Sequence, residues 1–222
     1  MKRVLIVDTE TTSLTPDYAS GSGVIWELAV IERATGEEYA WRMEPDVSVA
    51  SPEALAVGRF AERTRGMRHA TRAEVDARYG PHAWSVTRRT NLWNLARVRS
   101  RDCHWSDPAD LAGVLVENFL QDATIVGAVP SFDAGFLSAF LAHHGQDPKP
   151  WHYRLRDIGS MAWAWLQAHH LPHHLPAPSM DAGTDDLARA MGIEPGDFER
   201  HSALGDCRLV AAMLDVIEGG RL

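Results

Sequence analysis

Two acidic residues, Asp8 and Glu10, lie one residue apart near the start of the chain, in the run Val7-Asp8-Thr9-Glu10. Residues i and i+2 of a β-strand point to the same side, so in a strand these two carboxylates project together. Neighbouring carboxylates raise each other's pKa unless a cation lies between them, and Mg²⁺ prefers such oxygen ligands. The spacing is therefore that of a metal site, although a solvated strand end explains the pair about equally well.

Two further acids lie where helices are predicted to begin. Asp133 falls in the first turn of a helix that follows a short strand at 124–127, and Asp206 opens the last helix, five residues after His201. Taken one at a time, each acid is better explained by helix capping or by the helix dipole. His201 and Asp206 are about a turn and a half apart, so both can face one cleft.

Together these residues resemble the three motifs of the DEDDh 3′→5′ exonucleases, the superfamily of polymerase proofreading subunits, oligoribonuclease and ribonuclease T. The motifs are Asp8-x-Glu10, Phe132-Asp133 and His201-x₄-Asp206, in that order, and the resemblance runs from residue 4 to about residue 214 with a gap over an Arg-rich segment. It implies that the four carboxylates bind two Mg²⁺ or Mn²⁺ ions and that His201 is the general base. The implied products are nucleoside 5′-monophosphates.

The resemblance also implies contacts to a terminal nucleotide. Thr11 and Thr12 are predicted turn residues whose backbone approaches that nucleotide, and Leu14 is expected to wedge against its base, with apolar packing as the alternative. Phe132 is assigned to the same substrate-binding group. Family members often carry His-Asn shortly before Phe-Asp, whereas this chain has Ala-Val-Pro-Ser at 128–131. That departure affects substrate preference rather than catalysis.

Positive charge is concentrated in one segment of an otherwise acidic chain. The formal net charge is −8, but residues 59–104 hold 11 Arg against 4 acidic residues. Cations and the rings of Trp84, Trp93 and Trp105 are the ingredients of a single-strand binding surface. We expect this segment, with Arg88 and Arg89, to steer a strand toward the acidic cleft. A solvated insertion or a protein contact is an equally good explanation.

The composition is that of one globular domain. The chain has 222 residues, 45% of them hydrophobic, which predicts a single domain over 1–222 with an Arg/Trp-rich insertion at about 64–104. Cys103 and Cys207 have no metal-type spacing, and no apolar run approaches the ~20 residues of a membrane helix, so a cytoplasmic location is the default. Four histidines, His169, His170, His173 and His174, lie in a stretch that prolines interrupt. No Cys or acidic partner is spaced nearby, so the stretch is predicted to be a polar loop rather than a zinc site.

The order of elements predicts an α/β fold. Apolar runs indicate strands at 2–7, at 24–32 and 37–43 as a hairpin, at 124–127 and at 153–157. Caps and periodicity indicate helices starting near 52 and over 107–120, 131–143, 159–167, 184–192 and 202–217, with Thr184 as a cap. Three strands followed by helices alternating with single strands predict a mixed sheet. With the resemblance, the expected fold is ribonuclease-H-like: a mixed five-stranded sheet with helices on both sides.

The expected function is a metal-dependent 3′→5′ exonuclease that acts on single-stranded nucleic acid 3′ ends, with DNA favoured. An RNA-trimming, oligoribonuclease-like enzyme with the same site remains open, because the chemistry at the phosphate ignores the 2′ position unless a side chain contacts it. A catalytically silent, polymerase-associated binding module is the other alternative. The presence of all four carboxylates and of His201 counts against it, but not against a polymerase or a replication or repair partner.

Overall fold

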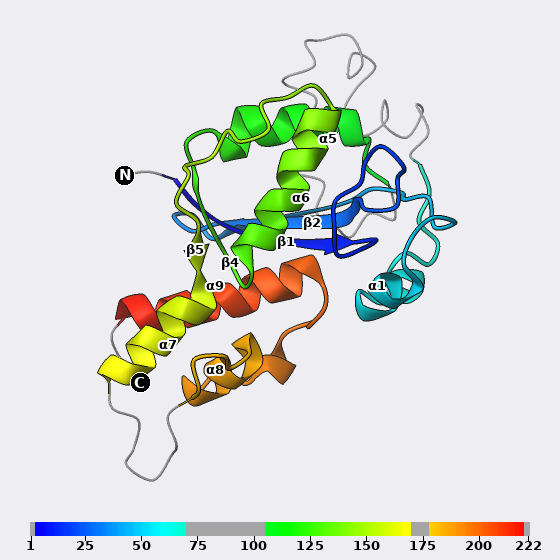
Figure 1. The fold of residues 1–222 in the computed structure, drawn as a ribbon. Helices are drawn as coiled ribbons and strands as arrows, with labels where there is room; N and C mark the ends of the chain where they lie inside the picture. The colour runs from blue at the N-terminus through cyan, green and yellow to red at the C-terminus, as the bar shows by residue number, and fades with distance from the viewer. Residues whose placement is uncertain (1–2, 70–104, 170–177, 220–222) are drawn as a thin grey trace.

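A five-stranded mixed sheet forms the centre of the computed structural model, which describes residues 3–69, 105–169 and 178–219 (Figure 1). The strand order is β3-β2-β1-β4-β5, with β1 antiparallel to β2 and parallel to β4. β2 pairs antiparallel with β3, and β4 pairs parallel with β5. The strands are β1 (Val4–Thr11), β2 (Ile25–Glu32), β3 (Glu37–Arg42), β4 (Thr124–Gly127) and β5 (Arg156–Asp157). The predicted mixed five-stranded sheet is confirmed.

Helices cover both faces of this sheet, as expected (Figure 1). α5 and α6 lie on one face, and α7, α8 and α9 lie on the other. The helices are α1 (Pro52–Val57), α2 (Phe60–Arg63), α5 (Pro108–Leu115), the π-helical turn η1 (Val116–Leu120), α6 (Pro130–His143), α7 (Ile158–Ala168), α8 (Thr184–Ala190), the 3₁₀ turn η2 (Pro195–Asp197) and α9 (Ala203–Gly219). In the described ranges, none of these helices combines the length and the apolar character that crossing a membrane requires.

The two central strands are buried on both faces, and their side chains alternate between two cores. Leu5 and Leu28 belong to the core beneath α5 and α6. Ile6 and Ala29 belong to the core beneath α9. A residue's position along β1 therefore decides which layer of helices it meets, and Asp8, two residues after Ile6, lies on the α9 face.

β1 is longer than the sequence predicted. The Thr-rich stretch expected to be a turn continues the strand as far as Thr11, because β2 pairs with it through Glu10 opposite Glu27. The register shifts only between Glu10 and Thr11. Asp8 and Glu10 thus lie within a paired strand rather than at its loose end, and the pairing fixes their common direction.

Local capping signals gave mixed results. Helices begin near residues 52 and 107, as predicted: Ser51 and Asp107 cap α1 and α5, and their side chains accept hydrogen bonds from the Ala54 and Asp110 amides. Thr184 was wrongly predicted as a cap: Gly183 precedes α8 and makes no side-chain cap bond. The helix expected over 107–120 turns π-helical after Leu115, and the strand expected at 153–157 is reduced to Arg156–Asp157.

Several sequence predictions fall on residues outside the described part of the chain. Arg88 and Arg89 are among them, as is most of the Arg/Trp-rich segment. Of the four loop histidines, His169 is described: its ring stacks on Trp165, with 4.3 Å between ring centroids, and its Nδ1 lies 2.9 Å from the Trp165 carbonyl oxygen.

Candidate metal centre and active site

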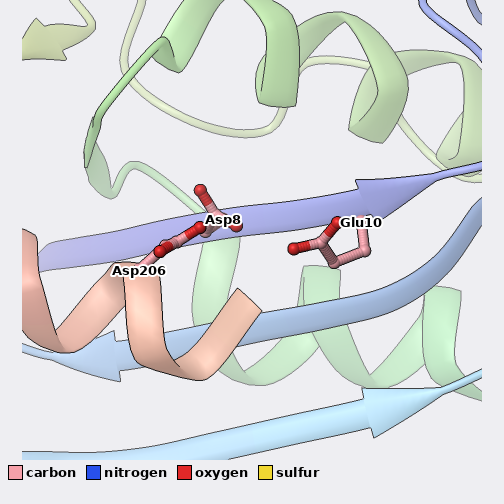
Figure 2. Close-up of side chains that lie close together, drawn as sticks. All are labelled: Asp8, Glu10 and Asp206. Carbon is pink, nitrogen blue, oxygen red and sulfur yellow. The ribbon is translucent and has the colours of Figure 1, made fainter. Parts of the chain in front are cut away.

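Three carboxylates meet where β1 passes beneath the start of α9. Asp8 and Glu10 extend from the same side of β1, and Asp206 reaches toward them from the first turns of α9 (Figure 2). Each offers a carboxylate oxygen, and these oxygens all lie within 4.8 Å of one another. Hard oxygen donors at this separation fit a divalent cation such as Mg²⁺ or Mn²⁺.

The electrostatics of this cluster also favour a cation. Removal from water raises the pKa of Asp8 well above its usual range, and the charges of Asp133 and Glu10 raise it further. The same loss of hydration, with the neighbouring Glu27 charge, raises the pKa of Glu10 to about 7. Carboxylates that repel one another in a half-buried site are stabilised in their ionised form by a bound metal ion.

Asp133 approaches the cluster from the opposite layer of the protein. It is buried in the first turn of α6, and its Oδ1 accepts hydrogen bonds from the Thr9 amide at 2.9 Å and the Thr9 hydroxyl at 2.8 Å. The β1–β4 pairing ends at Ile6 opposite Val126, so the Thr9 amide is free to bind a side chain instead of β4. Burial raises the pKa of Asp133 to about 7, while the two Thr9 bonds oppose that rise.

His201 lies on the segment that leads into α9, five residues before Asp206. Its backbone is left-handed, with φ of 58°, and the residue is exposed. Ser202 follows and caps the helix: its Oγ accepts the Gly205 amide at 3.0 Å and donates to the Glu199 carbonyl at 2.7 Å. All five predicted catalytic residues are described. Asp8, Glu10 and Asp206 form the metal-type group, and the Asp133 charge is close enough to raise the pKa of Asp8; His201 is not a member of the group.

Solved structures of exonucleases have a similar fold. A zinc-bound complex of E. coli exonuclease I with single-stranded DNA superposes with a TM-score of 0.62 and 19% identity over 99% of this chain. The nuclease domain of 3′hExo, a DEDDh family member bound to rAMP, superposes with a TM-score of 0.53 and 13% identity, again over 99% of this chain. The chain has the fold of the DEDDh exonucleases.

The similarity of fold spans nearly all of this chain but only part of some of the similar proteins. This chain covers 93% of the 3′hExo nuclease domain but only 41% of the E. coli exonuclease I chain, whose complex with a dA16 oligonucleotide also matches at a TM-score of 0.59 and 18% identity. No protein-family model matches the sequence, and no curated protein matches it.

Arg200 places a positive charge beside the carboxylate cluster. Its guanidinium contacts the Asp206 carboxylate and also binds Asp185 of α8, with Nε 3.0 Å from Oδ1. The charge of Arg200 lowers the pKa of Asp8 and Glu10, against the larger effect of burial. This arginine partly balances the negative charge of the carboxylates.

Glu27 is a further acid beside the cluster, and it is 1% exposed. It faces Glu10 across the β1–β2 ladder, and its carboxylate binds Arg42, Arg63 and the amide of Ala203 at the start of α9. From the sequence, Glu27 was predicted only to lie in a strand. The available signal was a single acid within the apolar run Ile25–Ile31, because a buried charge requires partners. Nothing local in the sequence pointed to Arg63.

The predicted nucleotide contacts have different surroundings. Leu14 is 83% exposed, so packing does not explain it. Thr12 is buried, and its amide, carbonyl and hydroxyl bind Val24, Ser51 and Ser22 within the protein. Thr12 therefore holds the loop after β1.

Two other residues complete this predicted group. The Thr11 hydroxyl donates to the Ser13 carbonyl at 2.7 Å. Phe132 packs against Phe136, with ring centroids 4.9 Å apart, at the edge of the core. A role of Thr11, Thr12, Leu14 and Phe132 toward substrate stays a prediction.

Proposed function

We propose that this protein is a metal-dependent 3′→5′ exonuclease of the DEDDh type that acts on single-stranded DNA. The observation that carries the proposal is the convergence of Asp8, Glu10 and Asp206, whose ligand oxygens lie within 4.8 Å of one another. The fold supports it, because the solved structures of similar fold include E. coli exonuclease I and the nuclease domain of 3′hExo.

The five predicted catalytic residues each have a task in this hydrolysis. Asp8, Glu10 and Asp206 would hold divalent ions, and Asp133 would complete the ligand set beside Asp8. Two Mg²⁺ or Mn²⁺ ions there would activate the attacking water and stabilise charge on the phosphoryl oxygens. His201 would accept the proton of that water, because an imidazole can act as a general base near neutral pH. The P–O3′ bond breaks, which leaves a 3′-hydroxyl on the strand and a nucleoside 5′-monophosphate.

DNA is the favoured substrate because the higher TM-scores belong to complexes described with single-stranded DNA. We assign the exposed Leu14, together with Thr11, Thr12 and Phe132, to contacts with the terminal nucleotide. Arg88 and Arg89 are assigned to the phosphates further along the strand. The 3′hExo nuclease domain, described with rAMP, keeps RNA as the second candidate substrate. No polymerase partner enters the proposal.

The test is digestion of matched 5′-labelled DNA and RNA oligonucleotides of one sequence, with Mg²⁺ or with chelator. We expect shortening by single nucleotides from the 3′ end that requires the metal and is faster on DNA. Asp206→Asn should reduce the rate by at least about 100-fold, because one metal-binding carboxylate is lost.

The matched control for this substitution is Asp215→Asn. Asp215 lies on the same helix, two thirds exposed, and pairs with Arg33. This variant should digest DNA at the rate of the unmodified protein. An Asp206→Asn variant with full activity would refute the assigned site, and binding of the oligonucleotide without any digestion would favour the silent binding module.

A further inference from the structure

Arg63 joins three parts of the protein that the chain order keeps apart. It ends α2 and its side chain is only 6% exposed. One terminal nitrogen, Nη2, binds Glu27 on β2. The other, Nη1, donates to the carbonyl oxygens of Gly58, at 3.3 Å, and of His201, at 3.2 Å. A planar guanidinium can donate hydrogen bonds to all of these acceptors at once, whereas a lysine ammonium cannot do so in the same geometry.

Glu27 also binds the segment that leads from His201 into α9. Its Oε2, which binds Arg63, also accepts the Ala203 amide at 3.0 Å. That amide is one of the first in α9 and has no partner within the helix. A carboxylate at this position also interacts favourably with the positive end of the helix dipole. Arg63 and Glu27 thus bind the backbone at His201 and at Ala203, two residues apart.

The segment between these two contacts carries backbone strain. His201 has φ of 58°, a left-handed conformation that is unfavourable for a residue other than glycine. Such a conformation persists only where the surroundings determine it. Here the carbonyl of His201 is held by Arg63, and the next helix begins under the carboxylate of Glu27.

We infer that Arg63, together with Glu27, is a positioning residue that holds the backbone of His201 so that its imidazole can serve the neighbouring carboxylate cluster. The inference rests on the proposed function, in which His201 is the general base. The pair contributes no ligand to the metal-type group of Asp8, Glu10 and Asp206. Its loss should therefore reduce turnover while leaving metal binding in place.

Arg63→Lys tests this inference because it keeps the positive charge beside Glu27 but removes the fork that reaches His201. We expect kcat on a single-stranded DNA oligonucleotide to fall by about 10- to 100-fold, with KM and Mg²⁺ affinity unchanged, since small displacements of a catalytic base cost that much. Glu27→Asp keeps the charge but withdraws the carboxylate by one methylene. It is the second variant, should Arg63→Lys fail to fold, and should give the same pattern.

Arg42→Lys is the matched control. Arg42 binds the other oxygen of Glu27, with Nε 2.7 Å from Oε1, and is also partly buried. It lies on β3, and its side chain binds Glu27 without reaching His201. The control should keep the unmodified kcat. An Arg63→Lys variant with unmodified kcat, or an Arg42→Lys variant that loses as much, would overturn the inference.

Hydrogen exchange provides a readout that does not depend on activity. In Arg63→Lys, amides in the segment 201–206 should exchange faster than in the unmodified protein, whereas Arg42→Lys should leave them unchanged. Equal exchange in both variants would overturn the positioning role even if turnover differed. If the unmodified protein released no nucleotides, the proposed function would fail, and the exchange comparison would still decide whether Arg63 holds this segment.

Discussion

Thr9 connects the two acids of β1 to the opposite layer of helices. Its neighbours Asp8 and Glu10 point toward α9, whereas the Thr9 hydroxyl and amide both donate to Oδ1 of Asp133 on α6. Burial raises the pKa of the Asp133 carboxyl group, the two Thr9 bonds lower it, and the resulting pKa is about 7. A single threonine therefore helps keep Asp133 ionised close to Asp8.

Replacing this hydroxyl should shift the pH dependence of the site. Thr9→Val keeps the side-chain shape but removes one of the two bonds, so the pKa of Asp133 should rise above about 7 and stability should fall by about 1 kcal/mol. The acid limb of the rate against pH should move to higher pH, as measured by oligonucleotide digestion. Thr9→Ser, which retains the hydroxyl, should restore the original limb; an unshifted limb in Thr9→Val would contradict this account.

At the scale of elements, the entry to α9 depends on close packing that only glycine permits. A Cβ at Gly205 would overlap the carbonyl oxygen of Glu199 and would lie 2.6 Å from its carbonyl carbon and 2.7 Å from Oγ of Ser202. The segment before the helix therefore folds directly over its first turn. The next residue is Asp206, so this packing also sets where that carboxylate meets β1.

Two glycine substitutions should have opposite effects. Gly205→Ala should destabilise the protein by about 1–3 kcal/mol, because the backbone at Glu199 must move. Gly135→Ala in α6, where an added Cβ meets nothing within 4 Å, should be neutral or stabilise by up to about 1 kcal/mol. Urea unfolding measures both changes. A Gly205→Ala protein as stable as Gly135→Ala would show that the packing before α9 is looser than described.

At the scale of the whole molecule, the site lies where two cores share one sheet. The core beneath α9 brings Asp206 onto β1, and the core beneath α6 brings Asp133 to the gap where β1 and β4 separate. The apolar packing of both layers thereby forces carboxylates into one region despite their repulsion. Metal binding and folding should consequently be coupled.

This coupling predicts opposite effects of pH with and without metal. In the folded protein the pKa values of Glu10 and Asp133 are about 7, against 4.5 and 3.8 in the absence of the fold. Between these values the folded state binds more protons than the unfolded state, so the contribution of the two groups to stability is lost as pH rises toward 7. Mg²⁺ should restore it, with a larger increase in Tm at pH 8 than at pH 6.

Thermal unfolding with Mg²⁺ or with chelator at the two pH values measures this difference. Asp206→Asn, which lacks a member of the metal-type group, is the control and should show a reduced Mg²⁺ effect at both. Equal Mg²⁺ shifts at pH 6 and pH 8 in the unmodified protein would show that the carboxyl groups do not titrate in this range.

The common direction of Asp8 and Glu10 was predictable from the sequence because the period of a strand is local. The caps at Ser51 and Asp107 and the mixed order of strands were predictable for the same reason: each depends on neighbouring residues or on the order of elements. The proposed role of His201 came from the resemblance of the motifs to those of the DEDDh exonucleases, and its distance to the cluster depends on how α9 is held.

Only the tertiary structure decided which distant residues meet. It grouped Asp206 with Asp8 and Glu10 while binding Asp133 to Thr9, and it extended β1 through Thr11 by pairing it with β2. The pairing of Glu27 with Arg63 joins residues 36 positions apart. Such contacts arise because helices pack on opposite faces of one sheet and bury charges that must find partners, and no local period in the chain encodes that choice.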